Sequence, residues 1–186
     1  MRKIVLAMSV TLDGFSAGPN GEMDWVTDNL DEEILSYIDD QLGNKGAILL
    51  GRVTYQIWAD YWPSQSGSIA EKIGNASKIV FSRTLAAAEW ENSRLVKGDA
   101  AGEVRQLKAQ PGRDLMLQGG VGLAQSFIKL GLVNEYQLLI YPMVLGAGKP
   151  LFRDIKDRLP LRLVQSRTFK NGAVLLVYRP AGADST

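Results

Sequence analysis

The stretch "DLMLQGGVGLAQSF", residues 114–127, decides the fold of this chain. An apolar run enters the double glycine at Gly119 and Gly120, and a helix-like pattern of apolar residues leaves it. A strand that passes directly into a helix through glycines has two explanations. The glycines make a tight structural turn, or they leave the backbone bare so that a phosphate group approaches the N–H groups at the start of the helix.

The same alternation of strand and helix extends outward from this stretch in both directions. Apolar strands are predicted at 3–10, 46–51, 77–82, 94–99, 113–118 and 135–146. Helices are predicted at 31–42, 52–62, 100–109 and 122–132. Asp28 or Asp31 caps the first of these helices, and Pro63 ends the second. Asn171 and Gly172 join the segments 159–169 and 172–180 into a closing β-hairpin.

Strands that are apolar throughout indicate a sheet that helices cover on both faces. We therefore expect an α/β fold with a mostly parallel sheet and an antiparallel edge formed by the C-terminal hairpin. One domain is expected over residues 1–180, with 181–186 as a flexible tail, because no linker divides the chain. The strand at 135–146 either pairs or packs across a two-fold axis or is a buried central strand.

The composition narrows the chemistry. Lys and Arg number 21 against 20 Asp and Glu, which gives no reason to expect a nucleic-acid or membrane partner. The chain has no Cys and no His, which excludes disulfides, Cys nucleophiles, Ser-His-Asp triads and His-based metal sites. No metal site is expected, although an all-carboxylate site stays open. A redox reaction carried by a bound organic cofactor fits these side chains, so we expect a cytoplasmic enzyme with a small-molecule substrate.

Ligands of such sheets bind beyond the carboxyl ends of the strands, and three strand ends here carry residues suited to phosphate groups. They are Gly51, Arg52 and Thr54, then Ser82 and Arg83, then Gly119, Gly120 and Gly122. Helix N-termini present N–H groups, and arginine offers a fork of donors. Each residue taken alone also fits a plain turn or a solvated charge. Ser82 beside Arg83, with no acidic residue at that strand end, favours a ribose 2′-phosphate and hence NADP over NAD.

Six segments together carry a more specific signal, in order along nearly the whole chain. They are "SVTLDG" (9–14), "GEMDW" (21–25), "LLGRVTY" (49–55), "VFSRT" (80–84), "LQGGVGLAQSF" (117–127) and "YPMVLGAGKPLF" (141–152). This set resembles the dihydrofolate reductase-like superfamily, and is most similar to the reductase domain of the bifunctional riboflavin-biosynthesis deaminase/reductase. The resemblance implies a three-layer dihydrofolate reductase-like sheet and an NADPH-dependent reductase that forms homodimers.

The resemblance also implies where NADPH is held. Gly51, Arg52 and Thr54 would hold cofactor phosphates, and Ser82 with Arg83 would bind the 2′-phosphate. The pyrophosphate would lie against Gly119, Gly120, Val121, Gly122 and Leu123. Ala17, Gly18, Met23 and Trp25 would lie on a mobile loop over the nicotinamide.

Hydride transfer also needs groups that orient or protonate the substrate. Asp13 and Asp24 are the candidate catalytic residues, although Asp13 before Gly14 also fits a turn residue and Asp24 a helix cap. The candidate substrate-binding residues are Trp25, Asp28, Tyr55 and Tyr141. The aromatic members of this set fit ordinary core residues as well.

Two departures from the family pattern bear on the substrate. Folate reductases carry a carboxylate on the first helix, and Leu30 stands at about the equivalent place. Riboflavin reductases usually carry a Lys before the first turn, where Ala7 stands here. We therefore expect reduction of another small heterocyclic or imine-like compound. Dihydrofolate reduction, ligand binding without turnover, and a flavin or deazaflavin in place of NADPH stay open as alternatives.

Overall fold

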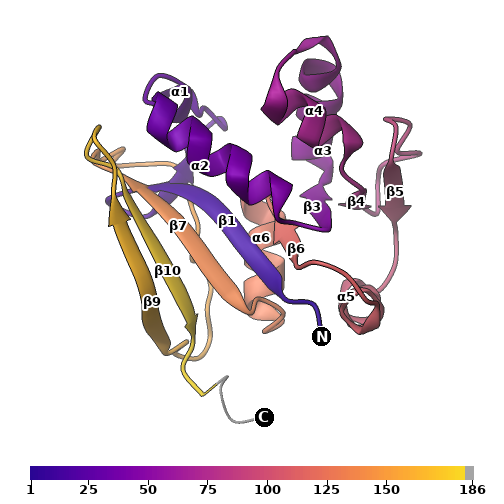
Figure 1. Cartoon of the computed structure of the whole chain (residues 1–186). Coiled ribbons are helices and arrows are strands. Elements are labelled where there is room, and N and C mark those ends of the chain that lie inside the picture. Colours follow the sequence, from indigo (N-terminus) through magenta and orange to yellow (C-terminus); the bar gives the residue numbers. More distant parts are fainter. Residues whose placement is uncertain (183–186) are drawn as a thin grey trace.

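The computed structural model describes residues 1–182, and a single mixed sheet organises them (Figure 1). In spatial order its strands are β5 (Ser93–Val96), β4 (Lys78–Phe81), β3 (Ala47–Gly51), β6 (Leu115–Leu117), β1 (Ile4–Thr11), β7 (Glu135–Tyr141), β10 (Val174–Pro180) and β9 (Leu161–Thr168). Strands β5 to β7 run parallel, and β10 and β9 follow as an antiparallel hairpin. The predicted α/β fold and its antiparallel edge are confirmed.

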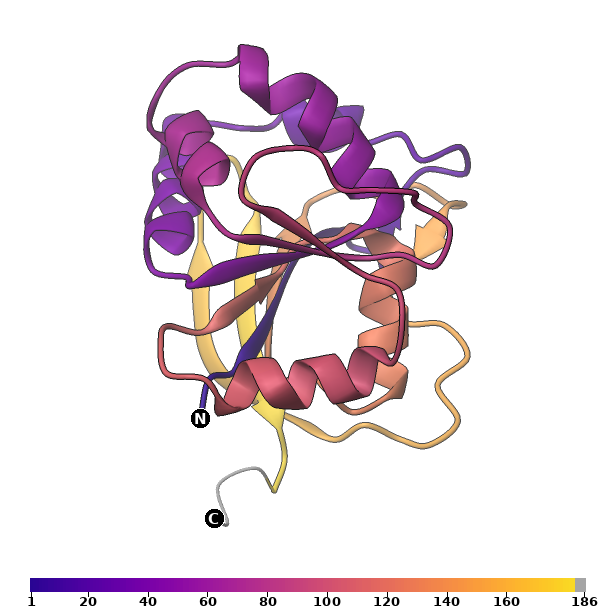
Figure 2. The same ribbon diagram turned by 90° about the vertical axis from the view of Figure 1, so that its right-hand side faces the viewer.

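Helices cover both faces of the sheet, as Figure 2 shows from the β5 side. The helices are α1 (Asp24–Thr27), α2 (Glu32–Gly43), α3 (Arg52–Tyr61), α4 (Ser68–Asn75), α5 (Ala100–Ala109) and α6 (Gly120–Lys129), and a 3₁₀ turn (Trp62–Ser64) follows α3. The sequence did not predict α4, whose flanks are rich in Ser and Gly. It is helical because Ala70 and Ile73 are buried against the rest of the molecule.

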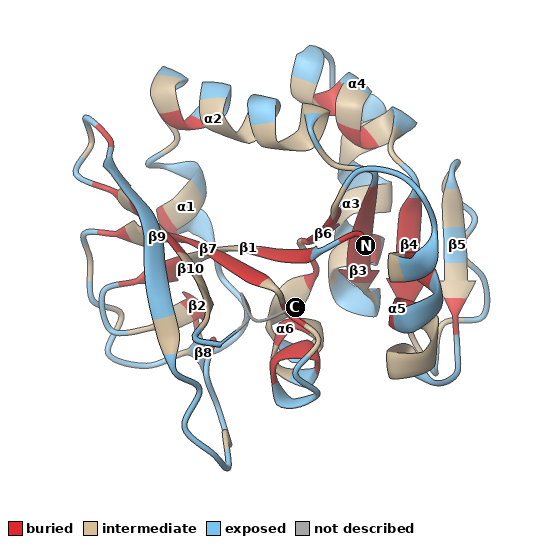
Figure 3. Ribbon diagram, turned by 60° about the horizontal axis from the view of Figure 1, so that its bottom comes forward, coloured by how far each residue is buried: buried red, intermediate tan, exposed pale blue. Residues whose placement is uncertain are grey.

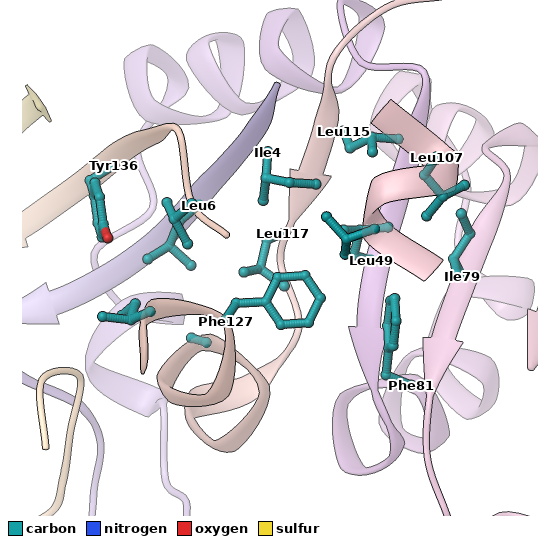
Figure 4. Close-up of a cluster of buried hydrophobic side chains, with 14 of the residues drawn as sticks. Ile4, Leu6, Leu49, Ile79, Phe81, Leu107, Leu115, Leu117, Phe127 and Tyr136 are labelled. Carbon is teal, nitrogen blue, oxygen red and sulfur yellow. The ribbon is translucent and has the colours of Figure 1, made fainter. Parts of the chain in front are cut away.

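The larger core lies between the sheet and the pair α5 and α6 (Figure 4). Alternate residues of the central strands, such as Leu6, Leu49 and Leu117, point toward this layer, and all three are fully buried. Phe127 of α6 lies among them and meets Phe81 edge to face, with ring centroids 5.3 Å apart. This packing holds α6 beneath the carboxyl ends of the strands.

Local chemistry explains where several elements begin and end. Asp31 is the N-cap of α2 and accepts a hydrogen bond of 2.8 Å from the N–H of Ile34, whereas Asp28 lies at the end of α1. The predicted strand 135–146 was too long, because β7 ends at Tyr141, before Pro142, which lacks an N–H group. Strand β7 lies between β1 and β10 and is therefore the buried central strand of the two alternatives.

A second, short antiparallel pair completes the fold. Strands β2 (Phe15–Ala17) and β8 (Lys149–Pro150) join the segment after β1 to the segment after β7. None of the helices in residues 1–182 has the length and apolar character needed to cross a membrane. The predicted flexible tail over 181–186 falls, for its last four residues, outside the described part of the chain.

Candidate functional site

The structure brings the three predicted phosphate-binding strand ends to one edge of the sheet. Strands β4, β3 and β6 are parallel neighbours, with Gly51 opposite Phe81 and Leu49 opposite Leu117. Ser82 and Arg83 therefore follow β4 beside Gly51, and Gly119 follows β6 on the other side of it.

The first glycine of the pair is required by packing. A Cβ atom on Gly119 would lie 2.5 Å from both the backbone N of Gly51 and the Cα of Leu50. Gly120 has a positive φ of 56°, and a Cβ there would lie 2.9 Å from the Thr54 hydroxyl. Gly122 has neither constraint, because a Cβ there would meet nothing within 4 Å. The structural-turn explanation thus holds for Gly119 and Gly120, but it leaves Gly122 unexplained.

The same glycines leave two helix starts side by side. Helix α3 begins at Arg52 directly after Gly51, and α6 begins at Gly120 directly after Gly119. Neither N-cap residue has a side chain that could bond the first-turn N–H groups, so these donors stay available to a ligand. We call this region, made of Gly51, Arg52, Thr54 and residues 119–123, the glycine cradle.

Two arginines lie at these strand ends, Arg52 within the glycine cradle and Arg83 after β4. Arg52 is exposed and donates to Gln56 Oε1 at 3.0 Å. Arg83 is exposed and makes no hydrogen bond or ion pair with the described residues. The Ser82 hydroxyl accepts hydrogen bonds from the N–H groups of Thr84 and Leu85, at 3.2 and 2.9 Å, and so shapes the turn that carries Arg83. An unpaired guanidinium beside two free helix N-termini fits an anionic phosphate ester.

Hydrogen bonds between its own residues hold the predicted nicotinamide loop together. Ala17 ends β2, and the Gly18 N–H donates to the Glu22 carbonyl at 2.9 Å. The Glu22 carboxylate accepts from both the backbone and the side chain of Asn20. Bonds from its own N–H and from Asn20 hold the pKa of Glu22 below its usual value. Met23, at the end of this loop, is 43% exposed.

The two candidate catalytic carboxylates differ in their surroundings. Asp13 accepts from the Thr11 hydroxyl at 2.6 Å and from the N–H groups of Leu145 and Gly146, and the Thr11 bond in particular lowers its pKa. It therefore anchors the turn after β1 to the loop after β7, and it holds no proton to donate near neutral pH. Asp24 begins α1, and its exposed side chain makes no hydrogen bond to the described residues.

Three of the four predicted substrate residues are buried, and the fourth is exposed. Trp25 and Tyr141 are buried against each other, with ring centroids 5.4 Å apart. Burial raises the pKa of Tyr141, and the nearby Ser9 lowers it by a smaller amount. The Tyr141 hydroxyl is buried without a well-formed hydrogen bond. The Tyr55 hydroxyl accepts from the Trp90 N–H at 2.9 Å within the core. Asp28 is exposed at the end of α1.

A cavity of about 220 Å³ opens instead between the sheet and the α2, α3 and α4 layer. Its floor includes Ala7, Ser9, Gln118, Gln137 and Leu139, from β1, β7 and the end of β6. Its roof includes Tyr37, Ile38, Leu42, Trp58, Trp62 and Ile73. None of Trp25, Asp28, Tyr55 and Tyr141 lines this cavity.

Two glutamines give the cavity floor its polar character. Ala7 pairs with Gln137, and Leu6 pairs with Leu117, so Gln118 and Gln137 flank Ala7 across three neighbouring strands. Gln137 accepts from the Tyr37 hydroxyl at 3.1 Å and donates to Glu135 at 2.9 Å. The Gln118 side chain has no hydrogen-bond partner in residues 1–182. Since Gln118 directly precedes Gly119, the cavity adjoins the glycine cradle.

Sequence reasoning missed Tyr37, Gln118 and Gln137. The available signal was a single polar residue at the end of "LMLQ" and inside "YQLLIY", two runs that are otherwise apolar. A polar side chain in a strand buried on both faces needs a partner, which makes it a candidate for binding. No group of three acidic side chains suited to a metal ion occurs within residues 1–182.

A family model and several known proteins match nearly the whole of this chain. The family model for the RibD C-terminal domain matches residues 2–175. The uncharacterized protein YyaP of Bacillus subtilis is 41% identical over 186 residues, which cover 95% of this chain and 94% of YyaP. The riboflavin biosynthesis protein RibD of Corynebacterium ammoniagenes is 25% identical over 78% of this chain, and the match spans 44% of that protein.

Solved structures share the fold. A putative riboflavin biosynthesis protein from Shewanella sp. PV-4 superposes with a TM-score of 0.77 at 23% identity, covering 97% of this chain and 99% of that one. A deaminase/5-amino-6-(5-phosphoribosylamino)uracil reductase of Thermotoga maritima gives a TM-score of 0.69 at 18% identity. The match covers 97% of this chain but 57% of the Thermotoga protein.

Proposed function

The chain belongs to the RibD C-terminal domain family, and on that premise we propose that it is an NADPH-dependent reductase. It transfers a hydride to a small heterocyclic or imine-like substrate. The reductase named in the Thermotoga relative supports this class of reaction. The substrate of this chain need not be the same, since Ala7 stands where the resemblance leads us to expect a Lys.

One observation carries the proposal: two glycine-started helices meet beside an unpaired arginine. The N–H groups at the starts of α3 and α6 suit the pyrophosphate, and Arg83 suits the 2′-phosphate. The open space at Gly122 fits close approach of a ligand, because no packing need explains that glycine. The nicotinamide ring supplies the hydride when the cofactor is bound.

The chain's own residues supply the binding surfaces. The apolar roof covers the cavity on the helix side, and Gln118 lies where cavity and glycine cradle adjoin. None of the residues that line the cavity is an acid. The proton that completes the reduction therefore comes from water rather than from a carboxylate such as Asp13.

Dihydrofolate reduction is the weaker alternative. Leu30 lines the cavity, Asp31 is used as the helix cap, and Asp28 faces solvent. No carboxylate is left to grip a pterin ring. The lack of an acid in the cavity also favours, as a second candidate, a protein that binds ligands without turnover.

A substitution at Gly122 tests the proposed cofactor site. Gly122→Asp places a negative charge in the first turn of α6, where it stabilises the helix and repels a pyrophosphate. We expect NADPH binding, measured by calorimetric titration, to weaken about tenfold or more without loss of thermal stability. Gly122→Ala adds bulk at the same place without charge; as the matched control it should weaken NADPH binding less than Gly122→Asp does. Equal affinity in Gly122→Asp would contradict the proposed site.

A further inference from the structure

We propose that this site takes an uncharged, flat ring compound with a lactam-type edge, rather than a substrate that carries a phosphate or a carboxylate. This inference rests on the proposed reductase function and names its substrate class. It is carried by the absence of charge around the cavity, by the two glutamines on its floor and by its aromatic roof.

The cavity lining contains no charged residue. Apart from the two tryptophans, its polar members are Ser9, Tyr37, Gln41, Gln118 and Gln137, all neutral. The nearest carboxylate along the floor, Glu135, is bound by Arg179 at 2.9 Å and by Gln137. A phosphate or carboxylate held here would lose its hydration without gaining a positive partner, which is costly.

The two glutamines set the polar pattern that a ligand must match. Each amide presents one donor group and one acceptor, which is complementary to the C=O and N–H of a lactam. The Gln137 amide is fixed by Tyr37 and Glu135, whereas the Gln118 amide is unpaired. They are two strand spacings apart, about 10 Å, which is the length of a bicyclic ring with its substituent atoms.

The remaining walls favour a flat and small molecule. Ala7 lies between the glutamines and contributes one methyl group, so a ring has room to lie over the sheet. Trp58 and Trp62 face the cavity from the roof, with their rings 6.0 Å apart and nearly perpendicular. The volume of about 220 Å³ lies below the roughly 300 Å³ at which typical ligand pockets begin, which disfavours an attached sugar phosphate.

The reaction balances without any ionisable group of the cavity. The hydride of NADPH forms a new C–H bond at the carbon of a C=N bond, and the π electron pair moves to nitrogen. Water supplies the proton that forms the N–H bond and becomes hydroxide, and NADP⁺ leaves. The substrate and the product are both neutral, because the proton from water removes the negative charge that hydride addition places on nitrogen.

Paired probe compounds test the inference. Each pair consists of a neutral bicyclic lactam and its carboxylate. The first pair is quinoxalin-2-one, which has a C=N bond, and its 6-carboxylate, and other bicyclic lactams supply further pairs. Binding is followed by tryptophan fluorescence, and NADPH consumption by absorbance. We expect the neutral member of a pair to bind about tenfold or more tightly than the charged member. Charged members that bind as tightly as neutral ones, or neutral lactams that show no binding, would overturn the inference.

Two variants assign the preference to particular residues. Gln118→Leu should weaken lactam binding about tenfold, and Gln106→Leu on the surface helix α5 is its control. Ala7→Lys should shift the preference toward the carboxylate. Unchanged lactam binding in Gln118→Leu, together with an unchanged preference in Ala7→Lys, would show that the ligand does not bind in this cavity. The fluorescence measurement needs no cofactor. If NADPH fails to bind, the proposed function is contradicted, but lactam binding to the cavity can still be measured.

Discussion

Substitution of Gly119 tests the physical explanation of the double glycine. In Gly119→Ala, the new methyl group would lie 2.5 Å from the Gly51 backbone N and 2.5 Å from the Leu50 Cα. These are backbone atoms of β3, so no flexible side chain can move aside. The ends of β3 and β6 must separate, which disturbs the starts of α3 and α6 at once.

The size of the effect follows from opposing contributions. Overpacking costs about 1–3 kcal/mol, and rigid backbone neighbours place this site near the upper end. The φ of −102° at Gly119 suits alanine. Alanine also reduces the freedom of the unfolded chain, which offsets about 0.4–1 kcal/mol of the overpacking cost. A net loss of about 2 kcal/mol remains, which lowers Tm by about 4–8 °C in a chain of this length.

Thermal and urea unfolding measure this loss, with Gly122→Ala as the matched control. A methyl group at Gly122 meets nothing within 4 Å and lies in a helix, so the control should gain about 0.5–1 kcal/mol. If the free energy of unfolding of Gly119→Ala lies within about 0.5 kcal/mol of that of the original protein, the close approach of β3 and β6 is not the reason for this glycine.

Three further predictions concern other parts of the molecule. Burial lowers the pKa of Lys78 to about 8 from 10.5, so the folded state binds fewer protons between these values. Urea unfolding should show stability rising with pH across that window, by at most about 1.4 kcal/mol per pH unit, and Lys78→Met should remove the slope. Strand β9 is largely exposed at the sheet edge (Figure 3), with Leu163 52% exposed, so we expect a homodimer through this strand and a monomer for Leu163→Glu by light scattering. A monomeric original protein, or a dimeric variant, would contradict that surface. Asp13→Asn should leave kcat within about twofold while loosening the loop at Gly146 to proteolysis, whereas a large fall in kcat would restore a catalytic role.

The sequence predicted the fold, and which strand ends lie together, better than it predicted which side chains are buried. Parallel strands ending in glycine and arginine must bring those residues to one edge, so Gly51, Arg83 and Gly119 lie as expected. The sequence does not show why residue 119 must be glycine, because the β3 backbone that it contacts is distant along the chain. Helix α4 was missed because it is only eight residues long, although Ile69, Ala70 and Ile73 follow a helical spacing.

The aromatic candidates show a related limit of the sequence. Trp25, Tyr55 and Tyr141 have the chemistry of a binding pocket, but that chemistry also fills a core, and burial decides between the two. Gln118 and Gln137 line the cavity because β6 and β7 pair with β1 in a register that puts both side chains on the same face of the sheet as Ala7. That register is a property of the folded sheet, and it cannot be derived from any one strand.

A comparison of NADPH and NADH binding tests the central proposal most directly. Calorimetric titration is made on the original protein, on Arg83→Ala, and on Arg158→Ala as an exposed arginine in a distant loop. We expect NADPH to bind at least about tenfold more tightly than NADH, and we expect this preference to be lost in Arg83→Ala and kept in Arg158→Ala. Equal binding of the two cofactors, or binding of neither, would contradict it.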